Sequence, residues 1–142
     1  MNLCFFLTPK QDVCVVNDSD SLRQVLEKME HHGYSTVPIL NHAGQYVGTI
    51  TEGDILWHLR NFNFPSLKEI ESTPIRDVVR RRDNEAVLID VDMEGLVNKA
   101  MNQNFVPVVD DNAVFIGIVT RKDLISYLGK DLQAEKKCAL VM

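Results

Sequence analysis

Two four-residue segments of this chain carry residue types that suit a phosphorylated sugar. They are Thr51-Glu52-Gly53-Asp54 and Thr120-Arg121-Lys122-Asp123, and each lies between an apolar run and a helical pattern. A helix N-terminus presents unpaired N–H groups and a partial positive charge, which favour phosphate. A threonine hydroxyl adds a donor, and an aspartate one turn into the helix can accept hydrogen bonds from the 2′ and 3′ hydroxyls of a ribose. The same Thr-x-x-Asp pattern also fits a capping box that only satisfies the helix start, so both interpretations stay open.

The two segments belong to an internal repeat with a spacing of 69 residues. Between 37–54 and 106–123, five of eighteen positions are identical: Val37, Pro38, Gly48, Thr51 and Asp54 match Val106, Pro107, Gly117, Thr120 and Asp123. Self-similarity at a fixed spacing is typical of a duplicated structural unit. The repeat therefore predicts two half-sites in one protein.

Hydrophobic periodicity predicts the same order of elements in both copies. The first copy has a strand over 14–16, an amphipathic helix from Leu22 that ends at Gly33, strands over 36–40 and 46–50 around a turn, and a helix from Thr51. The second has a strand over 86–89, a helix over 96–101, strands over 106–109 and 114–119, and a helix from Thr120 that Gly129 should end. One unit of this size buries too little surface to be stable alone. We therefore expect the two units to pack sheet against sheet.

The Val-Pro pairs mark the start of one strand in each copy. Proline removes a ladder donor, so Val37-Pro38 and Val106-Pro107 are typical of edge strands. An edge strand also leaves backbone groups free to contact the edge of an adenine ring. The residues expected to line that slot are Tyr34, Ser35 and Thr36 in one copy and Asn104 and Phe105 in the other.

The charges beside the two helix starts differ in sign. Arg121 and Lys122 flank the second, whereas Glu52 flanks the first, so we expect phosphate to prefer the second copy. The run Arg80-Arg81-Arg82 favours a solvated linker. Because it precedes the first strand of the second copy, Arg81 could alternatively contact a bound phosphate.

The composition predicts a soluble, globular protein. The 142 residues are 45% hydrophobic and 25% charged, and the net charge of −5 argues against nucleic-acid or anionic-membrane binding. No apolar run approaches the ~20 residues of a membrane span. Cys4, Cys14 and Cys138 lack metal-ligand spacing and fit free thiols in a cytoplasmic protein. No nucleophile or acid–base pair is evident, so we do not expect an enzyme.

The chain resembles a tandem pair of CBS domains, also called a Bateman module. The repeat order, the Val-Pro strand starts, Gly48 and Gly117, and the two Thr-x-x-Asp segments carry the resemblance, which covers about residues 7–129. It implies an α/β (α+β) fold of two strand-helix-strand-strand-helix motifs, packed by their sheets with pseudo-twofold symmetry. The expected boundaries are 7–62 for the first motif, 63–74 for a connector, 75–129 for the second motif and 130–142 for a C-terminal tail.

The resemblance also implies a regulatory function with no catalytic cofactor. The clefts between the motifs would bind an adenine nucleotide (AMP, ADP or ATP), with Asp54 and Asp123 at the ribose and Thr51 and Thr120 at the phosphate. A homodimer and an effector protein, which the sequence does not name, would carry the signal. The alternatives are a sensor of cyclic di-AMP or S-adenosylmethionine, and a ligand-free interaction module whose Thr-x-x-Asp segments are only helix caps.

Overall fold

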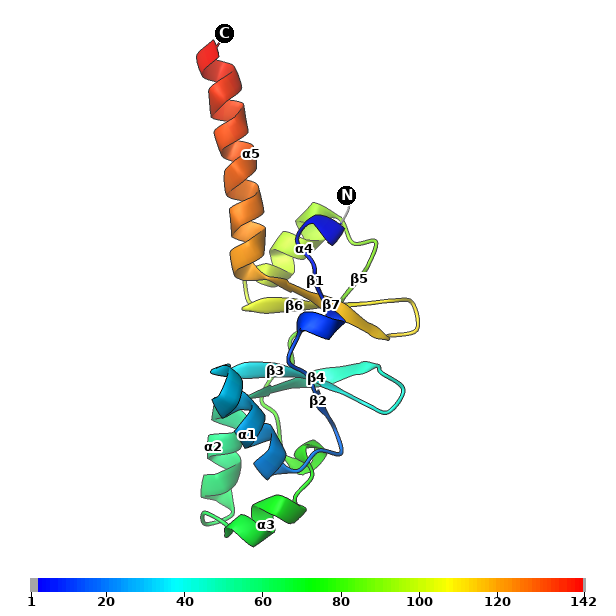
Figure 1. Cartoon of the computed structure of the whole chain (residues 1–142), viewed down its shortest axis with the longest axis vertical. Coiled ribbons are helices and arrows are strands. Elements are labelled where there is room, and N and C mark those ends of the chain that lie inside the picture. Colours follow the sequence, from blue (N-terminus) through cyan, green and yellow to red (C-terminus); the bar gives the residue numbers. More distant parts are fainter. Residues whose placement is uncertain (1–2, 142) are drawn as a thin grey trace.

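The molecule consists of two lobes whose sheets face each other, with helices on the outer faces (Figure 1). This is a computed structural model, and it describes the backbone of residues 3–141 and their side chains except those of 131, 134, 135 and 137–141. The Cys138 side chain therefore lies outside the described part. The predicted α/β fold of two repeated motifs packed by their sheets is confirmed.

The first lobe is a three-stranded sheet covered by helices. Its elements are β2 (Val16–Asn17), α1 (Leu22–His32), β3 (Thr36–Leu40), β4 (Tyr46–Thr51), α2 (Glu52–Asn61) and α3 (Leu67–Ser72). The strand order is β2-β3-β4, with β2 parallel and β4 antiparallel to β3. Helix α1 ends where predicted, at Gly33, whose φ of 70° is the left-handed conformation that glycine adopts without strain. Helix α3 lies inside the expected connector and was not predicted.

The second lobe repeats this arrangement. Its elements are β5 (Val87–Leu88), α4 (Met93–Ala100), β6 (Phe105–Val109), β7 (Phe115–Thr120) and α5 (Arg121–Val141). The sheet has a fourth strand, β1 (Thr8–Pro9), and its order is β1-β7-β6-β5. Single 3-10 turns form η1 (Leu3–Phe5), η2 (Lys10–Asp12) and η3 (Ile75–Asp77).

Individual hydrogen bonds follow the repeat. The side-chain oxygen of Asn41 accepts from the N–H groups two and four residues further along the chain, and Asp110 does the same in the second copy. The two hairpin turns that these residues organise then meet, because Gln45 and Val114 form an antiparallel bridge between the lobes. The two copies therefore share not only their element order but also individual hydrogen bonds.

The opening segment of each motif packs on the other lobe. Strand β1 pairs with β7, and Leu3 and Phe6 lie in the core of the second lobe. Conversely, Ile75 and Val78 lie in the core of the first lobe. The repeat alone did not predict this exchange, which ties the two lobes into one folding unit.

The predicted first strand of each copy is shorter in the structure. Residues 14–16 were expected as a strand, but β2 begins only at Val16, and β5 occupies only two of the four residues predicted over 86–89. Each of these strands pairs with just two residues of its neighbour. Cys14 and Val15 are therefore left outside the sheet.

The predicted helix end at Gly129 is wrong. Helix α5 continues through Gly129 to Val141, so the expected tail is helical as far as the structure describes it. Glycine in a helix interior costs only about 1 kcal/mol relative to alanine. The Lys, Leu, Gln and Ala residues that follow favour helix enough to offset that cost.

The edge-strand prediction holds for half of each strand. Both β3 and β6 lie inside their sheets, so as whole strands they are not edges. However, β2 pairs only with Ile39 and Leu40, and β5 only with Val108 and Val109. The Val-Pro halves of β3 and β6 therefore keep one side without a neighbouring strand.

In the described part of the chain, no helix is both long and apolar enough to cross a membrane.

The exchange of opening segments can be tested with two adjacent phenylalanines. Phe6 is 7% exposed in the core of the second lobe, whereas Phe5 is 78% exposed. We expect Phe6→Ala to lower the free energy of unfolding by about 3 kcal/mol, because it removes a buried ring and leaves a cavity. Phe5→Ala should change it by less than about 0.5 kcal/mol. Equal effects of the two substitutions in urea denaturation would contradict the observed packing.

Candidate functional site

The first Thr-x-x-Asp segment forms a complete capping box. The Asp54 N–H donates to the Thr51 hydroxyl oxygen at 3.0 Å, and the Thr51 N–H donates to one Asp54 carboxylate oxygen at 3.2 Å. The other carboxylate oxygen accepts from the backbone N–H of Arg81 at 3.1 Å. Asp54 is only 3% exposed and both of its carboxylate oxygens accept hydrogen bonds, so it acts as part of the helix cap.

The second segment is only half a capping box. The Asp123 N–H donates to the Thr120 hydroxyl oxygen at 3.1 Å, which matches the first copy. Among the described residues, the Asp123 carboxylate makes no hydrogen bond or ion pair, and it is only partly buried. Its two oxygens are therefore available to hydroxyl donors from outside the chain.

A cleft between the lobes connects Thr120 with the two Val-Pro strand starts. Its volume is about 310 Å³, at the small end of the ~300–1,000 Å³ range of ligand pockets. Both copies contribute predicted residues to its lining: Tyr34, Ser35, Thr36, Pro38, Asn104, Phe105 and Thr120. The structure thus gathers seven of the predicted site residues around one cavity.

Sequence reasoning missed five residues of this cleft: Thr8, Asp12, Val13, Cys14 and Ile118. Four of them lie on the segment that crosses between the lobes, and the repeat gave no signal of that crossing. Ile118 could have been found, because it lies two residues before Thr120 on the same strand. Burial raises the pKa of the Cys14 thiol, with Lys28 opposing in part, so Cys14 is a protonated, uncharged part of the wall.

On the pseudosymmetric side, Asp83 and Asn84 form hydrogen bonds with groups of both lobes. Asn84 donates from its carboxamide nitrogen to the Phe105 carbonyl at 3.1 Å, and its own N–H donates to the Thr49 hydroxyl oxygen at 3.0 Å. Next to it, the Asp83 carboxylate accepts from the Thr49 N–H at 3.0 Å. Tyr46 donates its hydroxyl to the Asn84 carbonyl at 2.5 Å, and burial raises the pKa of Tyr46, which keeps it a donor.

The predicted cations lie away from the cleft lining. Arg121 donates to the Ala100 carbonyl at 2.9 Å and so caps the C-terminus of α4. Arg81 places its guanidinium over the Trp57 ring, 5.1 Å from the ring centre, beside the first helix start. Lys122 is exposed at the start of α5. The role of these three residues at a phosphate therefore stays a prediction.

The remaining predicted residues are buried in the sheets. Val37 lies in the core of the first lobe and Val106 in the core of the second. Pro107 is also buried. A contact from these three residues to a ligand therefore stays a prediction.

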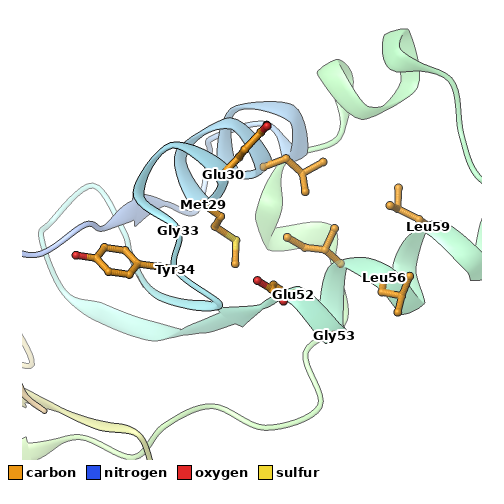
Figure 2. A pocket seen from close by; sticks show the side chains of 10 residues that line it. Met29, Glu30, Gly33, Tyr34, Glu52, Gly53, Leu56 and Leu59 are labelled. Carbon is orange, nitrogen blue, oxygen red and sulfur yellow. The ribbon is translucent and has the colours of Figure 1, made fainter. Parts of the chain in front are cut away.

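A larger apolar groove lies between α1 and α2, with a volume of about 870 Å³. Figure 2 shows Met29 directed from α1 toward the start of α2, with Leu56 and Leu59 along α2 and Tyr34 at the far edge. Tyr34 lines both this groove and the cleft between the lobes.

Within the described residues, no group of three His, Cys, Asp or Glu side chains is placed to hold a metal ion.

Comparison with known sequences places the chain among proteins with the same repeat. The model of the CBS domain family matches residues 7–61 and 71–130. An uncharacterised protein of Methanopyrus kandleri is 30% identical over 136 residues, covering 90% of this chain and 65% of the relative. The cyclic di-AMP receptor B of Bacillus subtilis is 26% identical over 137 residues, covering 93% of this chain and 89% of the receptor. This chain spans less than two thirds of the first relatives, 65% of the Methanopyrus protein and 44% of one from Methanocaldococcus jannaschii.

Solved structures share the whole architecture. The crystal structure of CbpB in complex with c-di-AMP has a TM-score of 0.87 at 26% identity, covering 96% of this chain and 90% of CbpB. CBSX2 in complex with AMP has a TM-score of 0.72 at 22% identity, covering 94% of this chain and 98% of CBSX2, which shows the shared fold.

Each of the two family matches includes one Thr-x-x-Asp segment and one Val-Pro strand. The chain therefore belongs to the CBS domain family and contains two CBS motifs.

Proposed function

We propose that this protein is a regulatory sensor that binds an adenine nucleotide in the cleft between its two CBS motifs. The observation that carries the proposal is the Asp123 carboxylate, which has no hydrogen-bond partner among the described residues. Asp123 is not in the cleft lining itself, but it lies three residues after Thr120, which is. A carboxylate in this position can accept both hydroxyls of a ribose, and Thr120 can donate to a phosphate. Asp54 cannot do the same without losing its own hydrogen bonds.

The other walls of the cleft suit a purine. Val13, Pro38 and Ile118 provide apolar surface for the faces of a planar base. The first half of β3 has no strand neighbour on the side of β2, so its backbone can bond to the edge of the base. The cleft thus offers separate contacts for base, ribose and phosphate.

Cyclic di-AMP is the second candidate ligand. The Bacillus subtilis receptor and CbpB are cyclic di-AMP proteins at 26% identity, and both align over more than 90% of this chain. Cyclic di-AMP contains the same adenosine unit, so the contacts described above apply to either ligand. S-adenosylmethionine shares the base and ribose but lacks a phosphate for Thr120.

We propose that the output passes through a partner surface, without catalysis, in the cytoplasm. Tyr34 lines both the ligand cleft and the apolar groove between α1 and α2. A ligand that fills the cleft would contact the same ring that bounds the groove. The groove is therefore a surface that ligand binding could alter directly.

We further propose that a second copy of this chain covers the groove. Leu56 on α2 is 53% exposed, and Ile125, its equivalent 69 residues later on α5, is 61% exposed. Both lobes thus present apolar helix faces of the same kind, which a twofold homodimer would bury against each other. The unidentified effector would then bind the dimer.

Ligand binding can be tested by calorimetry with AMP, ADP, ATP, cyclic di-AMP and S-adenosylmethionine. We expect at least one of them to bind and to slow the alkylation of Cys14, which lies in the cleft wall. Changing Cys4 and Cys138 to serine would restrict the labelling to Cys14. If all five ligands give no heat and leave the labelling rate unchanged, the chain is better described as a ligand-free interaction module.

The two aspartates should respond differently to substitution. We expect Asp123→Ala to weaken binding about tenfold or more, because a charged acceptor for the ribose is lost, and to change stability little. Asp54→Ala should lower the free energy of unfolding by about 1–3 kcal/mol, because two backbone donors lose their acceptor, and should leave affinity nearly unchanged. Calorimetry and urea denaturation of both variants measure the two effects. A larger loss of affinity in Asp54→Ala would reverse our assignment of the site.

The homodimer can be tested with a matched pair of leucines. Leu56 lines the groove, whereas Leu67 is 68% exposed on α3, outside it. We expect Leu56→Glu to produce monomers, because it places a charge in a buried apolar interface, and Leu67→Glu to leave the dimer intact. Light scattering after size-exclusion chromatography gives the mass of each variant. A monomeric wild-type protein would refute the homodimer.

A further inference from the structure

The two copies differ at the position where the opening segment meets the cleft. The first strands and the N-caps of the first helices (α1 and α4) are 71 residues apart, as Val16 and Val87 and the caps Ser21 and Asp92 show. By this spacing, Asp12 and Val13 of the first motif correspond to Asp83 and Asn84 of the second. The aspartate is the same in both copies, but the next position is the apolar Val13 in the first copy and Asn84, with its carboxamide, in the second.

Asn84 bonds to both lobes through its backbone and its carboxamide nitrogen. Its carboxamide nitrogen donates to the Phe105 carbonyl at 3.1 Å and to the Asn104 side-chain oxygen at 3.3 Å. Its backbone is held by Thr49 and Tyr46. The Phe105 carbonyl lies in the half of β6 that has no neighbouring strand, which is where a base edge would bind.

Val13 leaves the corresponding groups of the first copy available. It lines the open cleft and has no polar atom in its side chain, so it cannot donate to the carbonyl of Thr36, the equivalent of Phe105. A second pair of equivalent residues, one on β7 and one on β4, also differs in polarity. Ile118 lines the open cleft, whereas its equivalent Thr49 is fully buried and accepts the Asn84 N–H.

The ribose position is also closed on the side of Asn84. The Asp54 carboxylate accepts the Arg81 N–H at 3.1 Å and the Thr51 N–H at 3.2 Å. A ribose would have to displace the Arg81 backbone to reach it. The segment 81–84 therefore blocks both groups that would contact an adenosine, the base-reading carbonyl and the ribose-reading carboxylate.

We propose that Asn84 takes the place of an adenine 6-amino group, so that the second cleft is closed from within and each chain binds one adenosine ligand. This inference rests on the proposed function of the Thr120–Asp123 cleft. A carboxamide NH₂ offers the same kind of donor as the exocyclic amine of adenine. At the base contact the asymmetry lies in Asn84 on the closed side and Val13 on the open side, and at the ribose contact it lies in the Arg81 N–H that Asp54 accepts.

Reciprocal substitutions test the proposal. Calorimetry of the wild-type protein with AMP and with cyclic di-AMP as probes should give one adenosine site per chain. Val13→Asn should weaken the first site about tenfold, because the new carboxamide competes for the Thr36 carbonyl. Asn84→Val leaves the Arg81 N–H on Asp54 and the Gln103 carboxamide on the Phe105 carbonyl, so it should add no site and serves as the matched control. Two sites in the wild-type protein, or a Val13→Asn protein that binds the probe as tightly as the wild type, would overturn the inference.

Hydrogen exchange gives a readout that needs no ligand. The backbone amides of Thr49, Arg81 and Asn84 donate to side chains of this closed cleft, so they should exchange slowly in the ligand-free protein and stay unchanged when a probe binds. Fast exchange at these amides, or protection that appears only with a probe, would refute internal closure. If none of the five ligands named above binds the wild-type protein, the proposed function fails, and the exchange measurement alone decides whether the cleft is closed.

Discussion

Polar backbone and side-chain groups buried between the two sheets must find hydrogen-bond partners, and this constraint shapes the rest of the molecule. A buried donor or acceptor without a partner costs about 1–3 kcal/mol, which is large against the stability of a small protein. Asp54 shows the constraint fully met, since its buried carboxylate is bonded to two backbone N–H groups. Asp123 meets it through partial exposure to solvent, and this difference makes one helix start structural and the other available to a ligand.

The same constraint explains the glycine that both copies share in the third strand. A Cβ at Gly117 would lie 2.2 Å from the Thr8 carbonyl oxygen, and a Cβ at Gly48 would lie 2.5 Å from an Asp83 carboxylate oxygen. Each glycine thus lets the opening segment of a motif approach the neighbouring sheet closely enough to bond with it. The exchanged segments supply partners to β4 and β7, and they hold the two lobes in one orientation.

The sequence was sufficient for the features that depend on local pattern and on the repeat. The element order, the hairpin turns, the end of α1 at Gly33 and the pairing of two sheets followed from periodicity and spacing. The end of α5 did not, because Gly129 is a stop signal only where the chain can turn away, and the residues after it favour helix. The prediction of a strand at 14–16 failed because that segment crosses between the lobes instead of pairing along its length.

The candidate site was predictable as a set of residues but not as a geometry. Seven of the predicted residues line one cleft, yet the engagement of Asp54 depends on Arg81, 27 residues later in the chain. Such a long-range bond leaves no mark in the spacing of Thr51 and Asp54. The charge argument favoured the second helix start, but Arg121 bonds to α4, so the availability of Asp123 provides a stronger reason than the neighbouring cations.

Duplication explains why both copies persist although only one offers an unengaged carboxylate. Each lobe needs the other to cover its sheet and to receive its opening segment, so neither copy can be lost without unfolding the other. Binding imposes no such mutual requirement. One cleft can therefore exchange its ligand contacts for internal hydrogen bonds, as at Thr49, Asp54 and Asn84, and gain rigidity. The rigid side then holds β3 and β6 in place, and the open cleft between their first halves keeps a fixed shape for its ligand.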